Sequence, residues 1–210
     1  MSQQITAIEV FDKCAALYAE RFMEFELYND TFNAFSNNIT TKNARILDVA
    51  CGPGNITRYL LRQRPDFEVL GIDLAPNMVA LAGAHNPTAE FQIMDARHIG
   101  TLKQQFDGVM CGFCLPYLSK EETTQFIADA AQLLQPGGIL YLSTMEGDYW
   151  ASGFKKASTG DEVYMYYHNA DELVPVLALH GFTVLELWRK DFPGADGSTT
   201  VDLVVLARRK

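Results

Sequence analysis

Two carboxylates on either side of a glycine turn form the clearest ligand-binding pattern in this sequence. Asp48 lies at the end of a short apolar run typical of a strand buried on both faces, and the turn Cys51–Asn55 breaks that run. Glycines allow a backbone to bend sharply and to approach a ligand closely. Asp73 ends the next apolar run, roughly 20 positions after Gly54, the spacing at which an acidic residue meets a ribose in nucleotide-binding βαβ units. The alternative role for Asp73 is to cap the helix that follows.

The charge of Asp48 separates two classes of nucleotide ligand. A dinucleotide places its pyrophosphate on such a turn, and a nearby carboxylate would repel it. A ligand with an ammonium and a sulfonium group would be attracted instead. Thr57 also stands where the dinucleotide fingerprint has its third glycine. These features favour S-adenosyl-L-methionine, and an NAD(P)-dependent oxidoreductase is the alternative.

Four segments, in this order, resemble the class I S-adenosylmethionine-dependent methyltransferases. ILDVACGPGN, GIDLAPNMV and FQIMDAR look like the first three motifs of the family, and LLQPGGILYLST is similar to its turn and fifth strand. The resemblance covers roughly residues 44 to 145. It implies a Rossmann-like fold, methyl transfer to a small-molecule acceptor, and S-adenosyl-L-homocysteine as the product. A non-catalytic module that keeps the same cofactor fold is a further alternative.

The resemblance also implies which residues contact the cofactor. Asp73 would meet the ribose, Met78 would face the adenine, and Asp95 would accept the adenine amino group beside a backbone N–H. Two of these have structural alternatives: Met78 as a core residue and Asp95 as a loop-capping residue. The full predicted cofactor set is Tyr18, Asp48, Ala50, Cys51, Gly52, Gly54, Asp73, Leu74, Met78, Asp95, Ala96 and Cys111.

No motif encodes a catalytic base. Methyltransferases that act on amide or exocyclic amine nitrogens carry an Asp/Asn-Pro-Pro-aromatic motif after the fourth strand. This chain has Cys114-Leu115-Pro116-Tyr117 there, which disfavours such acceptors. The candidate bases are Glu146, Tyr117 and His168.

The pair Cys111 and Cys114 has the spacing of redox and zinc sites. A zinc site would need two further ligands, and no second C-x-x-C or H-x-x-x-H is present. We therefore expect half-buried thiols and no metal requirement. The four cysteines do not suggest a disulfide framework in a chain of 210 residues.

Composition limits the partners. Hydrophobic residues make up 48% of the chain, as in ordinary globular proteins, and the formal net charge is −9. A negative charge argues against nucleic acid. No apolar run approaches the length of a membrane span, and the first residues do not resemble a secretory signal. We expect a cytoplasmic monomer or homodimer whose partner is a small-molecule methyl acceptor.

Hydrophobic periodicity predicts the elements that position these residues. Strands are expected at 46–50, 67–73, 89–93, 106–111, 139–144, 182–190 and 199–209, and helices at 4–27, 29–37, 56–64, 77–84, 119–134 and 169–180. Ser119 and Glu122 form a capping-box pattern, and Pro175 should kink the last helix or delay its start. The last two strands, linked by 193–197, form a hairpin. The predicted fold is a doubly wound α/β sandwich with a seven-stranded, mostly parallel sheet, an antiparallel last strand and helices on both faces.

The chain is expected to be a single methyltransferase domain with four parts. Residues 1–40 form a helical lid whose Phe11-Asp12 pair and Tyr18 resemble the family's N-terminal pattern, and 44–145 form the cofactor-binding core. Residues 146–168 are an aromatic-rich insertion, expected as an acceptor-site wall, a packed hairpin, or both. Residues 169–210 supply a helix and the final β-hairpin.

Overall fold

The seven-stranded sheet of this chain is doubly wound, as the strand–helix alternation predicts. The computed structural model describes residues 2–156, 161–194, 197 and 199–210, without the side chains of residues 2–6. The strand order is β3-β2-β1-β4-β5-β9-β8. The strands are β1 (Arg45–Val49), β2 (Glu68–Asp73), β3 (Glu90–Ile93), β4 (Phe106–Cys111), β5 (Leu134–Met145), β8 (Phe182–Pro193) and β9 (Thr199–Arg209).

The last strand runs against its neighbours and lies inside the sheet. β1 to β5 pair in parallel, whereas β9 is antiparallel to both β5 and β8. The first residues of β9 therefore lie at the same edge as the carboxyl ends of β1, β2, β4 and β5, since Met145 pairs with Asp202. That edge is where open α/β sheets bind ligands.

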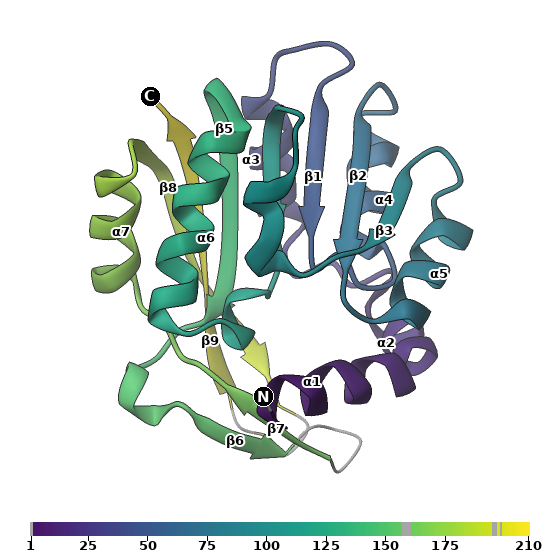
Figure 1. Cartoon of the computed structure of the whole chain (residues 1–210), viewed down its shortest axis with the longest axis vertical. Coiled ribbons are helices and arrows are strands. Elements are labelled where there is room, and N and C mark those ends of the chain that lie inside the picture. Colours follow the sequence, from purple (N-terminus) through teal and green to yellow (C-terminus); the bar gives the residue numbers. More distant parts are fainter. Residues whose placement is uncertain (1, 157–160, 195–196, 198) are drawn as a thin grey trace.

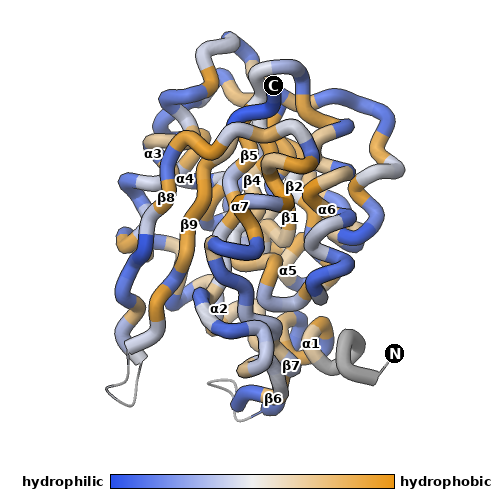
Figure 2. Tube along the Cα trace, turned by 90° about the vertical axis from the view of Figure 1, so that its left-hand side faces the viewer, coloured by the Kyte–Doolittle hydropathy of each residue, from blue (hydrophilic) through white to orange (hydrophobic). Residues whose placement is uncertain are grey.

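Helices cover both faces of the sheet (Figure 1). α3 (Asn29–Asn38) and α4 (Asn55–Gln63) pack on one face through Phe32, Phe35 and Leu60, and α5 (Pro76–His85) lies along β2 and β3. α6 (Lys120–Leu133) and α7 (Ala170–Leu179) pack on the other face through Phe126 and Leu173. Figure 2 shows hydrophobic residues concentrated along the central strands between these layers. Burial of these two apolar clusters is the main stabilising contribution to the fold.

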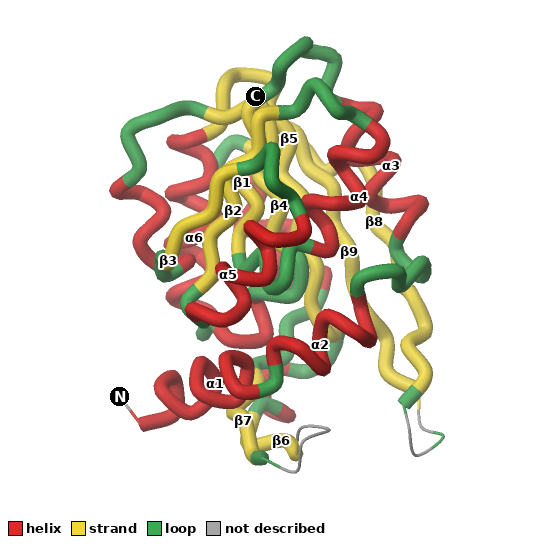
Figure 3. Tube along the Cα trace, turned by 90° about the vertical axis from the view of Figure 1, so that its right-hand side faces the viewer, coloured by secondary structure: helices red, strands yellow, loops and turns green. Residues whose placement is uncertain are grey.

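The N-terminal segment forms two helices that run below the carboxyl edge of the sheet (Figures 1 and 3). The single helix predicted over 4–27 is wrong: α1 (Ser2–Lys13) ends before Cys14, and α2 (Ala15–Phe22) follows it. Cys14 leaves the helical region with φ −98° and ψ 11°. The break lets each helix meet a different surface, with Phe11 on Tyr117 and Tyr18 near Gly52. The predicted helix 29–37 is present as α3.

The aromatic-rich insertion contains a second, two-stranded sheet. β6 (Gly153–Lys156) and β7 (Glu162–Met165) pair antiparallel, with Phe154 opposite Tyr164. Three short 3-10 turns lie next to strands near the carboxyl edge of the main sheet. They are η1 (Ala96–Thr101), η2 (Leu115–Tyr117) and η3 (Tyr149–Ala151). The hairpin expected for this insertion is confirmed, although residues 157–160 lie outside the described part of the chain.

Two local predictions have opposite outcomes. The capping box of α6 is confirmed, because the Ser119 side chain accepts from the Glu122 N–H and the Glu122 side chain accepts from the Ser119 N–H. Of the two effects expected of Pro175, a kink or a delayed start, the delayed start is wrong, since α7 begins at Ala170 and includes the proline. Asn169 caps the first turn of α7. Pro175 has no N–H to donate to the carbonyl of Asp171, which lies in that first turn.

Two predicted connections need qualification. The turn at 135–138 lies within β5, where Leu134 pairs with Phe106 and Ile139 with Gly108, so the intervening residues bulge from the ladder. In the link predicted at 193–197, residues 195–196 are outside the described part of the chain. None of the described helices combines the length and apolarity needed to cross a bilayer.

Candidate functional site

A cavity of about 610 Å³ lies between the carboxyl edge of the main sheet and the N-terminal helices. Its floor comes from the ends of β1, β2, β4 and β5 and the start of β9. Its other walls include α1, α2, β7, the starts of α4 and α5, the end of β8 and the segment from Phe25 to Phe32. The volume is within the range of small-molecule sites, about 300–1,000 Å³. Ten of the sequence-predicted site residues line it: Tyr18, Ala50, Cys51, Gly52, Asp73, Leu74, Met78, Asp95, Ala96 and Tyr117.

The turn after β1 is built from residues in the left-handed region. Ala50 has φ 53°, Gly52 φ 54° and Gly54 φ 81°. A Cβ at Gly52 would lie 3.8 Å from Tyr18 Cε1, so the tyrosine ring lies over this turn. Gly54 does not line the cavity: a Cβ there would come within 2.4 Å of Asn86 Nδ2 and 3.1 Å of Ala82 Cα. Close packing on α5 requires glycine at that position, which corrects its prediction as a cofactor contact.

Asp73 is held beside this turn by backbone groups. Its Oδ2 accepts from the Gly52 N–H at 2.9 Å, and its Oδ1 accepts from the Ala75 N–H at 2.9 Å. The second bond closes a turn just before α5, whose N-cap is Ala75 and which has no side-chain cap from Asp73, so the capping alternative for Asp73 is wrong. Burial raises the pKa of this carboxyl, while the bonds from Ala75 and Gly52 act against the rise. Each carboxylate oxygen keeps a lone pair for a ligand hydroxyl.

Asp48 lies below the turn and does not face the cavity. Its side chain is fully buried, and its Oδ2 accepts from Thr57 Oγ1 at 2.6 Å. Burial raises its pKa to about 7, and the hydrogen bond from Thr57 opposes that shift. The prediction that Asp48 contacts the ligand directly is therefore wrong. Thr57, in the first turn of α4, covers this carboxyl and donates its hydroxyl hydrogen to it.

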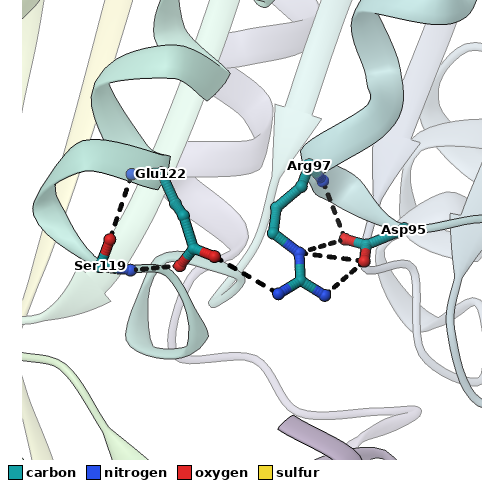
Figure 4. A network of polar contacts seen from close by, with 4 residues as sticks. All are labelled: Asp95, Arg97, Ser119 and Glu122. Atoms are coloured by element: carbon teal, nitrogen blue, oxygen red, sulfur yellow. Dashed lines mark hydrogen bonds and ion pairs between the residues drawn. The ribbon is translucent and has the colours of Figure 1, made fainter. Parts of the chain in front are cut away.

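Asp95 is part of a charged network, shown in Figure 4. Its Oδ1 accepts from the Arg97 N–H at 2.9 Å, which confirms the capping alternative, and both oxygens bond the Arg97 guanidinium. Arg97 also reaches Glu122 Oε1 at 3.4 Å, which connects the network to the capping box of α6. Burial pushes the pKa of Asp95 up, but the bonds from Arg97 outweigh it and hold the pKa below its usual value. Asp95 and Arg97 both line the cavity.

Of the three predicted catalytic residues, one lines the cavity and two do not. Tyr117 lines the cavity, and burial raises the pKa of its hydroxyl. Glu146 is paired with Arg189, with Oε2 at 2.6 Å from Nε. The His168 ring is buried, and its Nε2 donates to the carbonyls of Leu115 and Leu118 at 3.0 and 3.1 Å. Burial lowers the pKa of this imidazole. Glu146 and His168 also share a β-bridge, so both hold the insertion in place.

The cysteines do not form a reactive centre. Cys51, Cys111 and Cys114 are buried free thiols, and burial raises the pKa of Cys111 well above its usual value. Cys111 is enclosed by the sheet and does not line the cavity, contrary to its prediction as a cofactor contact. Within the described ranges, no group of three or more His, Cys, Asp or Glu residues is arranged to hold a metal ion.

The sequence analysis missed a polar pair at the far end of the cavity. Tyr28 donates its hydroxyl hydrogen to Asp202 Oδ2 at 2.5 Å. Beside them Phe113 has φ 56°, and its N–H donates to Ser143 Oγ at 2.9 Å. All four residues line the cavity. A signal for Asp202 was present, because it is an aspartate at the start of the otherwise apolar stretch Leu203–Ala207.

Comparisons with known proteins agree with this arrangement. Residues 46–138 match a family model described as a methyltransferase domain. The chain is 34% identical over 102 residues to the demethylmenaquinone methyltransferase of Deinococcus radiodurans. It is 34% identical over 111 residues to the ubiquinone biosynthesis O-methyltransferase of Xanthomonas oryzae pv. oryzae. These matches cover 47% and 49% of this chain, and the chain spans only 42% and 43% of the relatives' length.

The fold is also similar to that of solved methyltransferases. The 1,6-didemethyltoxoflavin-N1-methyltransferase of Burkholderia thailandensis superimposes with a TM-score of 0.72 over 98% of this chain and 88% of that one. The two are 20% identical, so this likeness concerns the fold.

Proposed function

We infer that this chain, which belongs to the class I S-adenosylmethionine-dependent methyltransferase family, binds S-adenosyl-L-methionine in the cavity and transfers its methyl group to a small molecule. The observation that carries this proposal is the carboxylate of Asp73, which is fixed on the N–H of Gly52 at the end of two adjacent parallel strands. A carboxylate held beside a left-handed glycine turn suits a ribose diol and the open backbone of a nucleoside ligand.

The cavity-lining residues fit the parts of this cofactor. Asp73 and Leu74 would hold the ribose, and the turn at Ala50–Gly52 would take the methionyl end beneath Tyr18. Met78, Ala96 and the Asp95–Arg97 pair would surround the adenine. Because Asp95 is already bonded to Arg97, we propose that it contacts the adenine amino group while charge-paired.

The cofactor supplies an activated methyl group, so the chain has mainly to position and enclose the acceptor. Holding the acceptor atom in line with the methyl carbon removes much of the entropic barrier. The aromatic side chains of α1 and α2 line the cavity and would exclude water from it. The size and apolar walls of the cavity support a small-molecule acceptor, and the two relatives are named for methylation in quinone biosynthesis.

Two measurements test this proposal in sequence. Isothermal titration calorimetry with S-adenosyl-L-homocysteine and with NADH should give binding of the first ligand only. Transfer of a labelled methyl group to a metabolite library should then give methylated products. Binding of NADH in preference would favour an oxidoreductase. Cofactor binding with no transfer to any acceptor would favour a regulatory module.

A further inference from the structure

Aromatic rings line the half of the cavity that is farthest from Asp73 and Asp95. These rings form a connected group: Tyr28 lies 5.2 Å from Phe113 and 5.9 Å from Phe25, and Phe25 lies 5.9 Å from Phe192. They come from the segment between α2 and α3, the loop after β4, and β8. This half is completed by Phe22, Phe32, Ser143, Met145, Thr200 and Asp202.

Asp202 places a carboxylate within this aromatic group. It is 3% exposed, it lines the cavity, and among the described residues its side-chain hydrogen bond is to Tyr28. Lys190 lies opposite Asp202 in the β8–β9 ladder, but its Nζ is 2.5 Å from Asp30 Oδ2. No ion pair joins Asp202 to a cationic side chain in the part of the chain that the structure describes. A buried carboxylate without a cation is unfavourable unless a ligand supplies one.

The protonation state of Asp202 suits such a ligand. Burial raises its pKa to about 6, and the hydrogen bond from Tyr28 acts against that rise. Above this pH the group is therefore mainly a carboxylate. Aromatic faces attract cations as well, and cages of aromatic rings are a known means of binding ammonium groups. The negative charge and the rings thus favour the same kind of ligand group.

We propose that Asp202, together with Tyr28 and the surrounding rings, binds the protonated amino group of an apolar aliphatic amine, which is the methyl acceptor. This inference rests on the proposed methyl transfer and specifies its acceptor. The motif that is missing after β4 belongs to planar amide and exocyclic amine nitrogens. An aliphatic amine differs from these, because its lone pair is a good nucleophile once a base has removed one proton.

The reaction then balances with residues of this chain. The ammonium gives one proton to the Asp202 carboxylate, and the freed nitrogen lone pair forms the N–C bond to the transferred methyl carbon. The C–S bond breaks with its electron pair on sulfur, which leaves S-adenosyl-L-homocysteine. The product is a methylammonium ion, and Asp202 returns its proton to water. Asp202 is thus both the counter-ion of the acceptor and its base.

A binding experiment separates the amine from other acceptors. Calorimetry measures the affinity of the full chain for 2-phenylethylamine, 2-phenylethanol and 4-methylphenol, with and without S-adenosyl-L-homocysteine. We expect 2-phenylethylamine to bind in preference, and Asp202→Asn to weaken it by about tenfold or more, as for loss of a close charge pair. The exposed neighbour Asp191 gives the matched control, since Asp191→Asn should leave amine binding unchanged. Asp202→Asn should also leave the affinity for S-adenosyl-L-homocysteine unchanged.

The pH dependence gives a second readout that a structural role would not produce. Amine affinity should fall as the pH is lowered through about 6. Tyr28→Phe should move that midpoint upward, because it removes the bond that lowers the pKa of Asp202. The other titratable or charged groups near this pair are Tyr18, Asp30, Tyr141 and Lys190, on α2, α3, β5 and β8.

Three outcomes would overturn the proposal. The amine and the alcohol could bind equally well, or the amine could fail to bind at millimolar concentration. The phenol could also bind in an Asp202-dependent manner while the amine is rejected. A loss of affinity for S-adenosyl-L-methionine but not for S-adenosyl-L-homocysteine in Asp202→Asn would show that Asp202 faces the sulfonium instead. Amine binding is also measured without S-adenosyl-L-homocysteine. If S-adenosyl-L-homocysteine itself does not bind, the proposed function is refuted, and this result is distinct from a failure of the amine to bind.

Discussion

At the scale of single residues, the carboxylates at the carboxyl edge of the sheet differ mainly in the group that donates a hydrogen bond to each of them. Asp73 accepts two backbone N–H groups, Asp48 accepts a threonine hydroxyl beneath the turn, and Asp202 accepts a tyrosine hydroxyl. Asp95 alone of these four is bonded to an arginine. Within one small region, the same residue type therefore accepts hydrogen bonds from backbone N–H groups, from hydroxyl groups and from a guanidinium group.

Asp73→Ala should weaken binding of S-adenosyl-L-homocysteine by roughly 2–4 kcal/mol, as expected for loss of a charged, bidentate hydrogen-bond partner. Calorimetry on the folded variant measures this. Because Asp73 also holds the N–H groups of Gly52 and Ala75, Asp73→Asn is a useful second variant that keeps the shape and one acceptor oxygen. The exposed Asp171 provides a control, Asp171→Ala. An unchanged affinity in Asp73→Ala would remove the ribose assignment.

Asp48 should make stability depend on pH. Its folded pKa of about 7 lies above the ordinary value of 3.8, so its contribution to stability is complete below pH 4 and is lost as the pH rises through 7. Asp48→Asn should abolish that decline and raise the free energy of unfolding at pH 8 by roughly 2–4 kcal/mol. Urea unfolding of both proteins from pH 4 to 8 tests this. A parallel pH dependence in the two proteins would contradict the burial argument.

At the scale of elements, α1 contributes to the start of α5. Ala75 precedes that helix and offers no side-chain cap, but Asp12 Oδ1 accepts from the Asn77 N–H at 2.6 Å. Asn77 Nδ2 donates back to Asp12 Oδ2 at 3.0 Å. The N-terminal helices are thus attached to the core by a helix cap provided from another element, at an exposed position where water competes for the same groups.

The N-terminal helices should become more protected when ligand binds. Their aromatic side chains line the cavity, and a bound ligand would add apolar surface for them to cover. Hydrogen exchange with and without S-adenosyl-L-homocysteine should show slower exchange over 8–28 in the bound state, with α6 as the unchanged reference. Asp12→Ala should speed exchange of the free lid. If 8–28 exchange equally slowly in both states, the segment is fixed packing and Tyr18 has no role in closure.

The capping box should contribute measurably to α6. Ser119→Ala removes the acceptor for the Glu122 N–H and should lower the free energy of unfolding by about 1 kcal/mol. Thr124 lies on the same helix and bonds the Lys120 carbonyl, so Thr124→Ala should be neutral or slightly stabilising. Urea denaturation compares them. Equal effects of the two substitutions would mean that the cap contributes nothing beyond helix propensity.

Local patterns predicted the elements well, whereas contacts between distant segments were not predictable. The strands, the glycine turn and the capping box each follow from a few adjacent residues. Tyr28 and Asp202 are 174 positions apart and meet only because β9 inserts between β5 and β8. The break at Cys14 was missed because the apolar spacing on both sides of it fits one helix. Asp48 was placed wrongly because its neighbours in sequence do not reveal that Thr57 faces it.

At the scale of the whole molecule, the cavity is lined by residues at the ends of most strands of the main sheet and by residues of the N-terminal helices. It has a polar half at the ends of β1, β2 and β3 and an aromatic half at β4, β5, β8 and β9. Each half comes from a different part of the chain. The resemblance to cofactor motifs lies between residues 46 and 97. The aromatic half draws on residues 22–32 and on later residues of the chain, namely Phe113, Ser143, Met145, Phe192, Thr200 and Asp202.

Methyl transfer should not require a metal ion. The described cysteines at β4 are buried, and no acidic or histidine cluster accompanies them in the described residues. Dialysis against EDTA should leave cofactor binding and transfer unchanged. Loss of activity that one divalent ion restores would show that a metal site has been overlooked.

The interior position of β9 has a consequence for how the protein is synthesised. Of the seven strands, β9 is the last to leave the ribosome, yet it must lie between two strands made earlier. Until it arrives, β5 presents an open, apolar edge and β8 has no partner, a state that invites pairing with other chains. The nascent protein therefore completes its polar half first and gains its aromatic half, with Asp202, only at the final step of sheet assembly.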